Sequence, residues 1–203
     1  MIIDFILNID KHLASIVSAY GSLTYLILFL IIFCEVGLVI TPFLPGDSLL
    51  FVAGAISSIT SLNIVLLFII CACAAIIGNI INYYIGIYFS SLALRHINPL
   101  YLEKTNKFYE KYGGFTIIAS RFMPIIRTFA PFIAGVGKMN PFKFISYSII
   151  GGILWTGLFL FVGYFFGNIP IIKDNFSIVV IIIIILSLLP ALIEYLRIKL
   201  SRH

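Results

Sequence analysis

Residues 121–131 read Arg-Phe-Met-Pro-Ile-Ile-Arg-Thr-Phe-Ala-Pro and lie within an otherwise apolar segment that runs from Gly113 to Gly137. A proline inside a helix removes a backbone donor and clashes with the preceding turn. An arginine near the bilayer centre costs about 2.5–3.5 kcal/mol on insertion scales. Two of each make this segment a poor spanning helix, and we interpret 113–137 as a re-entrant hairpin that returns to the side it entered from.

The chain as a whole has the composition of a membrane protein. Of its 203 residues, 62% are hydrophobic and only 10% are charged, whereas soluble domains carry charge on roughly a quarter of their residues. Four apolar stretches approach, with their flanks, the ~20 residues that cross a bilayer: 22–33, 64–81, 145–166 and 178–189. We therefore expect an all-α polytopic protein with about four transmembrane helices, folded as a single membrane domain over residues 1–203.

The first half of the chain carries a similar interruption. Tyr20–Ile40 is the first strong spanning candidate, and the run Thr41-Pro42-Phe43-Leu44-Pro45-Gly46-Asp47 follows it. We predict a re-entrant hairpin over 42–61. The predicted organisation is an N-terminal interfacial helix (1–19), a first half (20–94), a cytoplasmic amphipathic linker (95–112), a second half (113–196) and a basic tail (197–203).

The basic residues favour one topology. With both hairpins re-entrant, ten of the thirteen basic residues are cytoplasmic, only Lys173 is outside, and two arginines stay in the membrane, as the positive-inside rule favours. Both termini are then expected in the cytoplasm. Two hairpins that enter from opposite sides, each followed by a span, form an inverted repeat, which is typical of secondary transporters. The small pairs Ala53-Gly54 and Ala134-Gly135 would let backbones pack closely.

Four charged residues are the candidate site: Glu35, Asp47, Arg121 and Arg127. Unpaired charges at this depth are costly, so we expect the acids of the first hairpin region and the arginines of the second to neutralise one another; the alternative is that the side chains reach the headgroups. Burial disfavours an ionised carboxyl group and a nearby arginine favours it, so such an acid can exchange a proton when its partner moves. Guanidinium groups bind phosphate through two parallel hydrogen bonds, which makes the arginines candidate ligands for a lipid phosphate.

Other signals are weaker. Gly78, Asn82 and Gly86 share a helical face, which indicates close helix packing more often than ligand contact. Trp155 is interpreted as an interfacial anchor. The three cysteines have the pattern of neither a disulfide framework nor a zinc site, and the histidines do not group with them, so we expect no metal and no cofactor.

Several motifs together resemble the DedA family of bacterial inner-membrane proteins. They are Glu35-x-Gly37 with Pro42-x-x-Pro45-Gly46-Asp47, Gly78-Asn79-x-x-x-Tyr83-x-x-Gly86, Arg121-Phe122-x-Pro124-x-x-Arg127-x-x-x-Pro131-x-x-Ala134-Gly135, and Tyr147-x-x-x-Gly151-Gly152-x-x-Trp155. The resemblance implies two opposed hairpins with functional acids at Glu35 and Asp47 and functional arginines at Arg121 and Arg127. It also implies hairpin and packing roles for Pro42, Pro45, Gly46, Gly78, Asn79, Tyr83, Gly86, Pro124, Pro131 and Gly135.

The resemblance also implies a function. Family members are linked to membrane homeostasis and to the proton motive force, and some act as translocases for undecaprenyl phosphate or phosphatidylethanolamine. Three positions depart from the family's usual residues and bear on the substrate more than on the fold. They are Asn79, where an acid is common, Ile87, where a basic residue is common, and Ser148, where asparagine is common.

Three functions stay open from the sequence. The first is a proton-coupled flippase for a lipid phosphate, with membrane lipids as its partners and no nucleic acid. The second is a proton- or cation-coupled transporter of small solutes that affects membrane homeostasis indirectly. The third is an assembly factor without transport, which would tolerate Glu35→Gln and Asp47→Asn. We do not expect an enzyme, because a lipid phosphatase would need a nucleophilic histidine with acidic and basic partners, and His12, His96 and His203 are wrongly placed for this.

Overall fold

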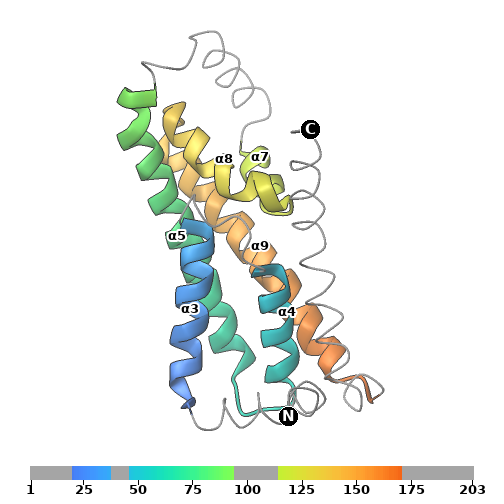
Figure 1. The fold of residues 1–203 in the computed structure, drawn as a ribbon. Coiled ribbons are helices and arrows are strands. Elements are labelled where there is room, and N and C mark those ends of the chain that lie inside the picture. Colours follow the sequence, from blue (N-terminus) through green and yellow to red (C-terminus); the bar gives the residue numbers. More distant parts are fainter. Residues whose placement is uncertain (1–19, 38–45, 94–113, 171–203) are drawn as a thin grey trace, which may run out of the picture. The chain divides into compact units, whose positions relative to one another are not determined.

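The computed structural model describes residues 20–37, 46–93 and 114–170, which are helical apart from short turns and contain no strand (Figure 1). The described helices are α3 (Ser22–Gly37), α4 (Gly46–Ser57), α5 (Ile64–Ala93), α7 (Phe115–Ser120), α8 (Pro124–Val136) and α9 (Pro141–Gly167). Several predicted features lie outside the described residues: the interfacial helix 1–19, Pro42, Pro45, the linker 95–112, the last span and the basic tail.

Two helices are long and apolar enough to cross a membrane, Ile64–Ser90 within α5 and Pro141–Gly167, which is α9. The others are short. At 1.5 Å per residue, the 12 residues of α4 reach about 18 Å and the 13 of α8 about 20 Å, less than the hydrocarbon core of about 30 Å. The helical content and the two long helices agree with an all-α membrane protein.

The chain divides into two compact units, and each is described by itself. The first contains the start of α3, α4, the start of α5 and the end of α9. In it, the backbone N–H of Asn63 donates to the Tyr25 hydroxyl at 2.8 Å, and the Tyr25 ring packs against Ala55, Ile56 and Leu62. The start of α3, the end of α4 and the start of α5 therefore lie together.

The second unit contains the end of α3, most of α5, α7, α8 and the first part of α9. Here Gly37, the last residue of α3, packs against Gly78, which lies near the middle of α5; a Cβ on Gly37 would be 3.3 Å from the Cα of Gly78. The helix α3 thus begins level with the start of α5 and ends halfway along it. Residues 38–40 of the expected span Tyr20–Ile40 lie outside the described residues, so that span stays a prediction.

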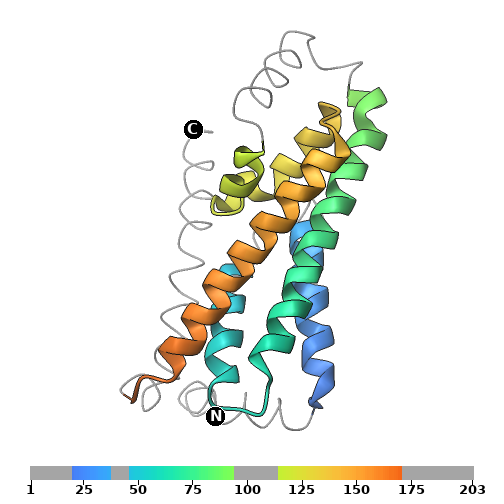
Figure 2. The same cartoon turned by 180° about the vertical axis from the view of Figure 1, so that it is seen from behind.

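The segment predicted as the second hairpin is a broken helix. The helix α7 ends at Ser120, and α8 starts at Pro124 after a turn in which Met123 is extended. Proline suits the first position of a helix because its missing N–H has no partner there. Pro131 lies inside α8 without ending it. Figure 2 shows α7 and α8 from behind, beside the first part of α9.

Each unit contains one short helix that crosses one long helix through glycine. In the first unit, a Cβ on Gly54 of α4 would overlap the carbonyl of Leu160, and one on Gly163 of α9 would overlap the carbonyl of Phe51. In the second unit, a Cβ on Gly135 of α8 would overlap the carbonyl of Tyr83, and one on Gly86 of α5 would overlap the carbonyl of Phe132. In both crossings each glycine faces the carbonyl three residues before the other glycine.

The two long helices also begin alike. Asn63 precedes α5, and its Oδ1 accepts from the N–H of Leu66 at 3.1 Å. Asn140 precedes α9, and its Oδ1 accepts from the N–H of Lys143 at 3.2 Å. Asparagine is a preferred N-cap because it satisfies a donor that has no partner within the helix. The crossing glycines, Gly86 and Gly163, lie the same number of residues after these caps, so α5 and α9 occupy equivalent positions in the two crossings.

Candidate functional site

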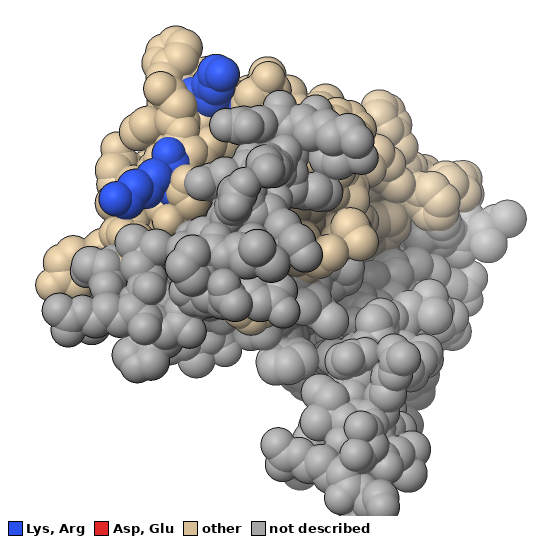
Figure 3. All heavy atoms as spheres, turned by 90° about the horizontal axis from the view of Figure 1, so that it is seen from above, with Lys and Arg blue, Asp and Glu red and all other residues tan. Residues whose placement is uncertain are grey.

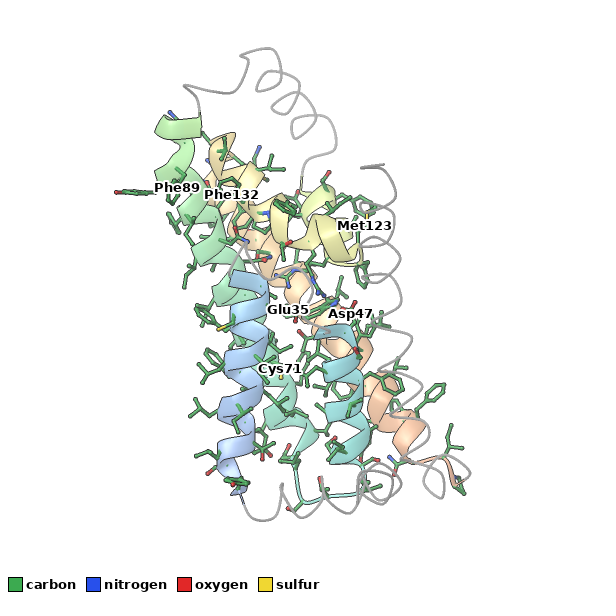
Figure 4. All side chains as sticks on the ribbon, in the orientation of Figure 1. Glu35, Asp47, Cys71, Phe89, Met123 and Phe132 are labelled. Carbon is green, nitrogen blue, oxygen red and sulfur yellow. The ribbon has the colours of Figure 1, made fainter. Side chains whose placement is uncertain are left out.

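A buried ion pair joins α3 to α8. Glu35 lies in the last turn of α3 (Figure 4), and Arg127 lies in the first turn of α8, which begins at Pro124. The Arg127 Nη2 donates to the Glu35 Oε1. The exposed fractions are 3% for the arginine side chain and 0% for the glutamate. Breaking such a buried ion pair by removing one partner is strongly destabilising.

The ion pair lies beside the only tryptophan of the chain. Trp155 of α9 is fully buried, and its ring centroid is 5.1 Å from the guanidinium carbon of Arg127. A cation over an indole ring is attracted by the negative face of the ring. The interpretation of Trp155 as an interfacial anchor is therefore wrong. The side chain packs in the interior, where it contacts the charged group.

Arg121 is buried as deeply but has different partners. It follows α7 and is 2% exposed. Its Nη2 donates to the backbone oxygen of Ser148 at 3.2 Å, to the Ser148 Oγ at 3.3 Å and weakly to the Ala75 oxygen at 3.5 Å. All of these acceptors are neutral. Within the part of the chain that the structure describes, the buried Nε and Nη1 of Arg121 have no hydrogen-bond acceptor.

Two adjacent glycines make room for the Arg121 side chain. A Cβ on Gly151 would lie 3.1 Å from the Arg121 Cδ and 3.2 Å from its Nε, and one on Gly152 would lie 3.4 Å from its Nη2. Any side chain at Gly151 would therefore crowd the arginine. Sequence reasoning did not connect the glycine pair with this arginine, although two adjacent glycines within a long helix are a signal of close approach.

Two asparagines of α5 fix the surrounding helices. The Asn79 Nδ2 donates to the Ser148 Oγ at 3.2 Å, so Asn79 and Arg121 share one hydroxyl group. The Asn82 Nδ2 donates to the carbonyls of Val36 at 3.2 Å and Thr128 at 2.9 Å. Asn82 thereby ties the end of α3 and the start of α8 to α5. These bonds position Glu35 and Arg127 for their contact.

The remaining residues that were predicted for the motifs make packing contacts between helices. Gly78 packs against α3, and Gly86 and Gly135 form the crossing in the second unit, where Figure 4 labels Phe132 on α8. The Tyr83 hydroxyl donates to the Met139 carbonyl, and the ring of Tyr83 stacks on Phe144 with centroids 4.3 Å apart. These contacts join α5 to the start of α9 and to the turn that precedes it.

Asp47 belongs to the first unit. Gly46 and Asp47 form the first turn of α4; Gly46 is buried and Asp47 is half-buried. That Asp47 joins the charged group stays a prediction. The expectation that both arginines pair with acids is met for Arg127 only, because the acceptors of Arg121 are the neutral oxygens of Ser148 and Ala75. Among the described residues, no group of three histidine, cysteine, aspartate or glutamate side chains comes together.

The 62% hydrophobic composition and the two membrane-length helices agree with the class of integral membrane proteins. The family profile described as the VTT domain matches residues 44–165. The chain therefore belongs to this family, the DedA family that its motifs resemble. Protein DedA of Escherichia coli K12 is 52% identical over 98% of this chain and 94% of its own length.

More distant relatives are also named as membrane proteins. An uncharacterized membrane protein of Mycobacterium tuberculosis H37Rv is 37% identical over 92% of this chain and 85% of its own length. Inner membrane protein YghB of Escherichia coli K12 is 28% identical over 85% of this chain and 78% of its own length. No solved structure gives a significant match.

Proposed function

We propose that this protein is a flippase that moves a lipid phosphate, such as undecaprenyl phosphate, across the inner membrane with proton coupling. The observation that carries the proposal is the pair of buried arginines at the break between α7 and α8, one bound to Glu35 and the other to neutral oxygens. Charged residues inside a membrane domain mark ion or substrate paths. A guanidinium group is a suitable ligand for phosphate.

The proposed architecture has two opposed re-entrant hairpins. The first consists of α3 and α4, because the start of α3 and the end of α4 both lie beside the start of α5. The second consists of α7 and α8, whose outer ends lie beside the start of α9. Each hairpin precedes a long helix, and the equal register of the glycine crossings supports an inverted repeat. The hairpin expected over 42–61 contains α4 and stays a prediction, and the proposal adds α3 to it.

The proposed orientation follows the basic residues. Figure 3 looks onto a face that shows exposed basic side chains and no described acid, and Lys138 and Lys143 are exposed near the start of α9. The positive-inside rule places this end in the cytoplasm. The proposal keeps the expected multi-pass chain with a cytoplasmic C-terminus, which lies outside the described residues. The expected cytoplasmic N-terminus lies outside the described residues and stays a prediction.

The ion pair supplies a mechanism for proton coupling. Protonation of Glu35 would remove its negative charge and so weaken its bond to Arg127. Arg127 could then join Arg121 in binding the phosphate of the lipid. Loss of the proton would restore the pair and release the lipid. In this scheme, Asn82 and Trp155 keep the two helices and the guanidinium group in place.

The test is a flipping assay with purified protein in liposomes. Wild-type protein should move a fluorescent polyprenyl phosphate between leaflets faster than protein-free vesicles do. Arg121→Lys and Arg127→Lys should each slow this movement, because an ammonium group does not offer the planar pair of donors. If neither the polyprenyl phosphate nor a phospholipid moves faster than in empty vesicles, the lipid-transport proposal is wrong.

The alternative is a proton- or cation-coupled transporter of small solutes. The fully buried Glu35 is compatible with this alternative, because one exchangeable carboxyl group serves either scheme. The arginines distinguish the two. A general positive field would survive both Arg→Lys variants, whereas a phosphate site would not.

A further inference from the structure

Among the described residues, one of the two buried arginines has a carboxylate partner and the other has neutral acceptors. Arg127 has a carboxylate partner, Glu35, while Arg121 is held by Ser148 and Ala75. We propose that Arg121, Asn79 and Ser148 form the primary subsite for a singly charged phosphate group, and that Arg127 binds it only after its ion pair opens. This inference rests on the proposed function and states where the phosphate group of the lipid would bind first.

The first argument is the charge itself. Arg121 is 2% exposed, and among the described residues it contacts neutral oxygens only. Isolated buried charges are unstable without a counter-charge. An anion that reached the unpartnered Nε and Nη1 would supply that charge and two acceptors. A singly protonated phosphate ester carries one negative charge, which matches the one positive charge.

The second argument is the chemistry of Asn79. It is 2% exposed, and its Nδ2 donates to Ser148, while its Oδ1 has no donor among the described residues. A protonated phosphate offers one O–H group, which this oxygen could accept. With the amide turned by 180°, Asn79 would offer an N–H to a phosphate oxygen instead. Either way, its neutrality leaves the charge of Arg121 available to a ligand.

The third argument is the position of Ser148. Its Oγ accepts from both Asn79 and Arg121, so one hydroxyl group aligns the two side chains. The absence of side chains at Gly151 and Gly152 lets the guanidinium group lie against α9 beside it. Ser148 is therefore a positioning residue, and Arg121 and Asn79 are the residues that would contact the phosphate.

The decisive experiment introduces a competing charge in the intact protein. Asn79→Asp places a carboxyl group of the same size within two hydrogen bonds of Arg121. We expect binding of dodecyl phosphate in detergent, measured by titration calorimetry, to fall by at least about tenfold, since the new pair occupies the arginine. The melting temperature should stay level or rise. A merely structural role would lower binding and melting temperature together.

Two further variants complete the test. Asn140→Asp is the matched control, because Asn140 is exposed and aspartate caps a helix as well as asparagine does; it should bind like wild type. Asn79→Leu keeps the site neutral and of similar size, and it should bind a few-fold more weakly than wild type. If Asn79→Asp does not fold, Asn79→Leu still tests the proposal. Unchanged binding of dodecyl phosphate by Asn79→Leu would contradict a contact between Asn79 and the phosphate.

The outcomes separate this inference from the proposed function. If Asn79→Asp binds dodecyl phosphate like wild type, the subsite is wrong, even where wild type flips polyprenyl phosphate. If wild type binds dodecyl phosphate, Asn79→Asp does not, and no lipid is flipped, the subsite stands and lipid transport is wrong. Competition by inorganic phosphate at equal concentration would identify a free anion as the ligand of the same subsite, whereas no competition identifies a lipid headgroup.

Discussion

The crossing of α4 with α9 and the crossing of α8 with α5 share one backbone register but differ in polar content. Counted from the crossing glycines, Gly46 in α4 stands where Arg127 stands in α8. Counted along the long helices, Thr156 in α9 stands where Asn79 stands in α5. Packing therefore requires the glycines in both crossings but does not require the arginine or the asparagine. The arginine and the asparagine occur only in the second crossing, although both crossings pack in the same way. Since packing does not explain these two residues, we attribute them to function.

The largest expected effect breaks the ion pair that distinguishes the second unit. Glu35→Ala removes the carboxylate that accepts from the buried Arg127 Nη2, and we expect a loss of about 3–5 kcal/mol of stability. Thermal unfolding in detergent measures it. The double variant Glu35→Leu with Arg127→Met should recover much of the loss while remaining inactive in flipping, since a buried ion pair often contributes little net stability. A double variant as unstable as Glu35→Ala would contradict this account.

The next effect concerns the feature that the two crossings share. Gly54→Ala and Gly135→Ala each place a methyl group onto a backbone carbonyl, of Leu160 and Tyr83 respectively. The helices must shift, at a cost of about 1–3 kcal/mol. Comparable losses in melting temperature would support equivalent crossings. Gly157→Ala is the control, because its added Cβ would meet its nearest neighbour, the ring of Phe68, at 3.4 Å. Tolerance of Gly54→Ala alone would show that the crossings are not equivalent.

The smallest effect concerns the helix caps. Asn63→Ala and Asn140→Ala each remove the acceptor for backbone donors at the start of a long helix. We expect losses of about 1 kcal/mol for each, seen as small decreases in melting temperature. Asn63→Asp and Asn140→Asp should restore the wild-type value. An effect at only one cap would show that the two long helices begin under different constraints.

The sequence predicted the parts of the molecule that depend on local composition. The charges and prolines of 121–131 indicated a broken helix, and the structure breaks the chain before Pro124. Family membership followed from spaced motifs. The packing partner of α3 was not predictable in the same way, because the apolar composition of α3 does not reveal that Gly37 packs against Gly78.

The partners of the charged residues were only partly predictable. Opposite charges within the membrane were expected to pair, and Glu35 and Arg127 form such a pair. The bonds that Arg121 and Asn79 each make to Ser148 depend on how three helices pack, and the two residues of the Asn79–Ser148 bond are 69 positions apart. The burial of Trp155 was missed for a similar reason, since an indole ring suits both a membrane interface and the face of a buried cation.

Asn82 gives the ion pair a property that the two charged side chains could not provide themselves. Its amide donates to the main-chain oxygens of Val36 and Thr128, each one residue away from a member of the pair. Those bonds do not depend on whether Glu35 carries a proton. In the proposed scheme, the ion pair between Glu35 and Arg127 can therefore break while the hydrogen bonds of Asn82 hold α3 and α8 at the same relative position. The two charged side chains then stay close enough to pair again when Glu35 loses its proton.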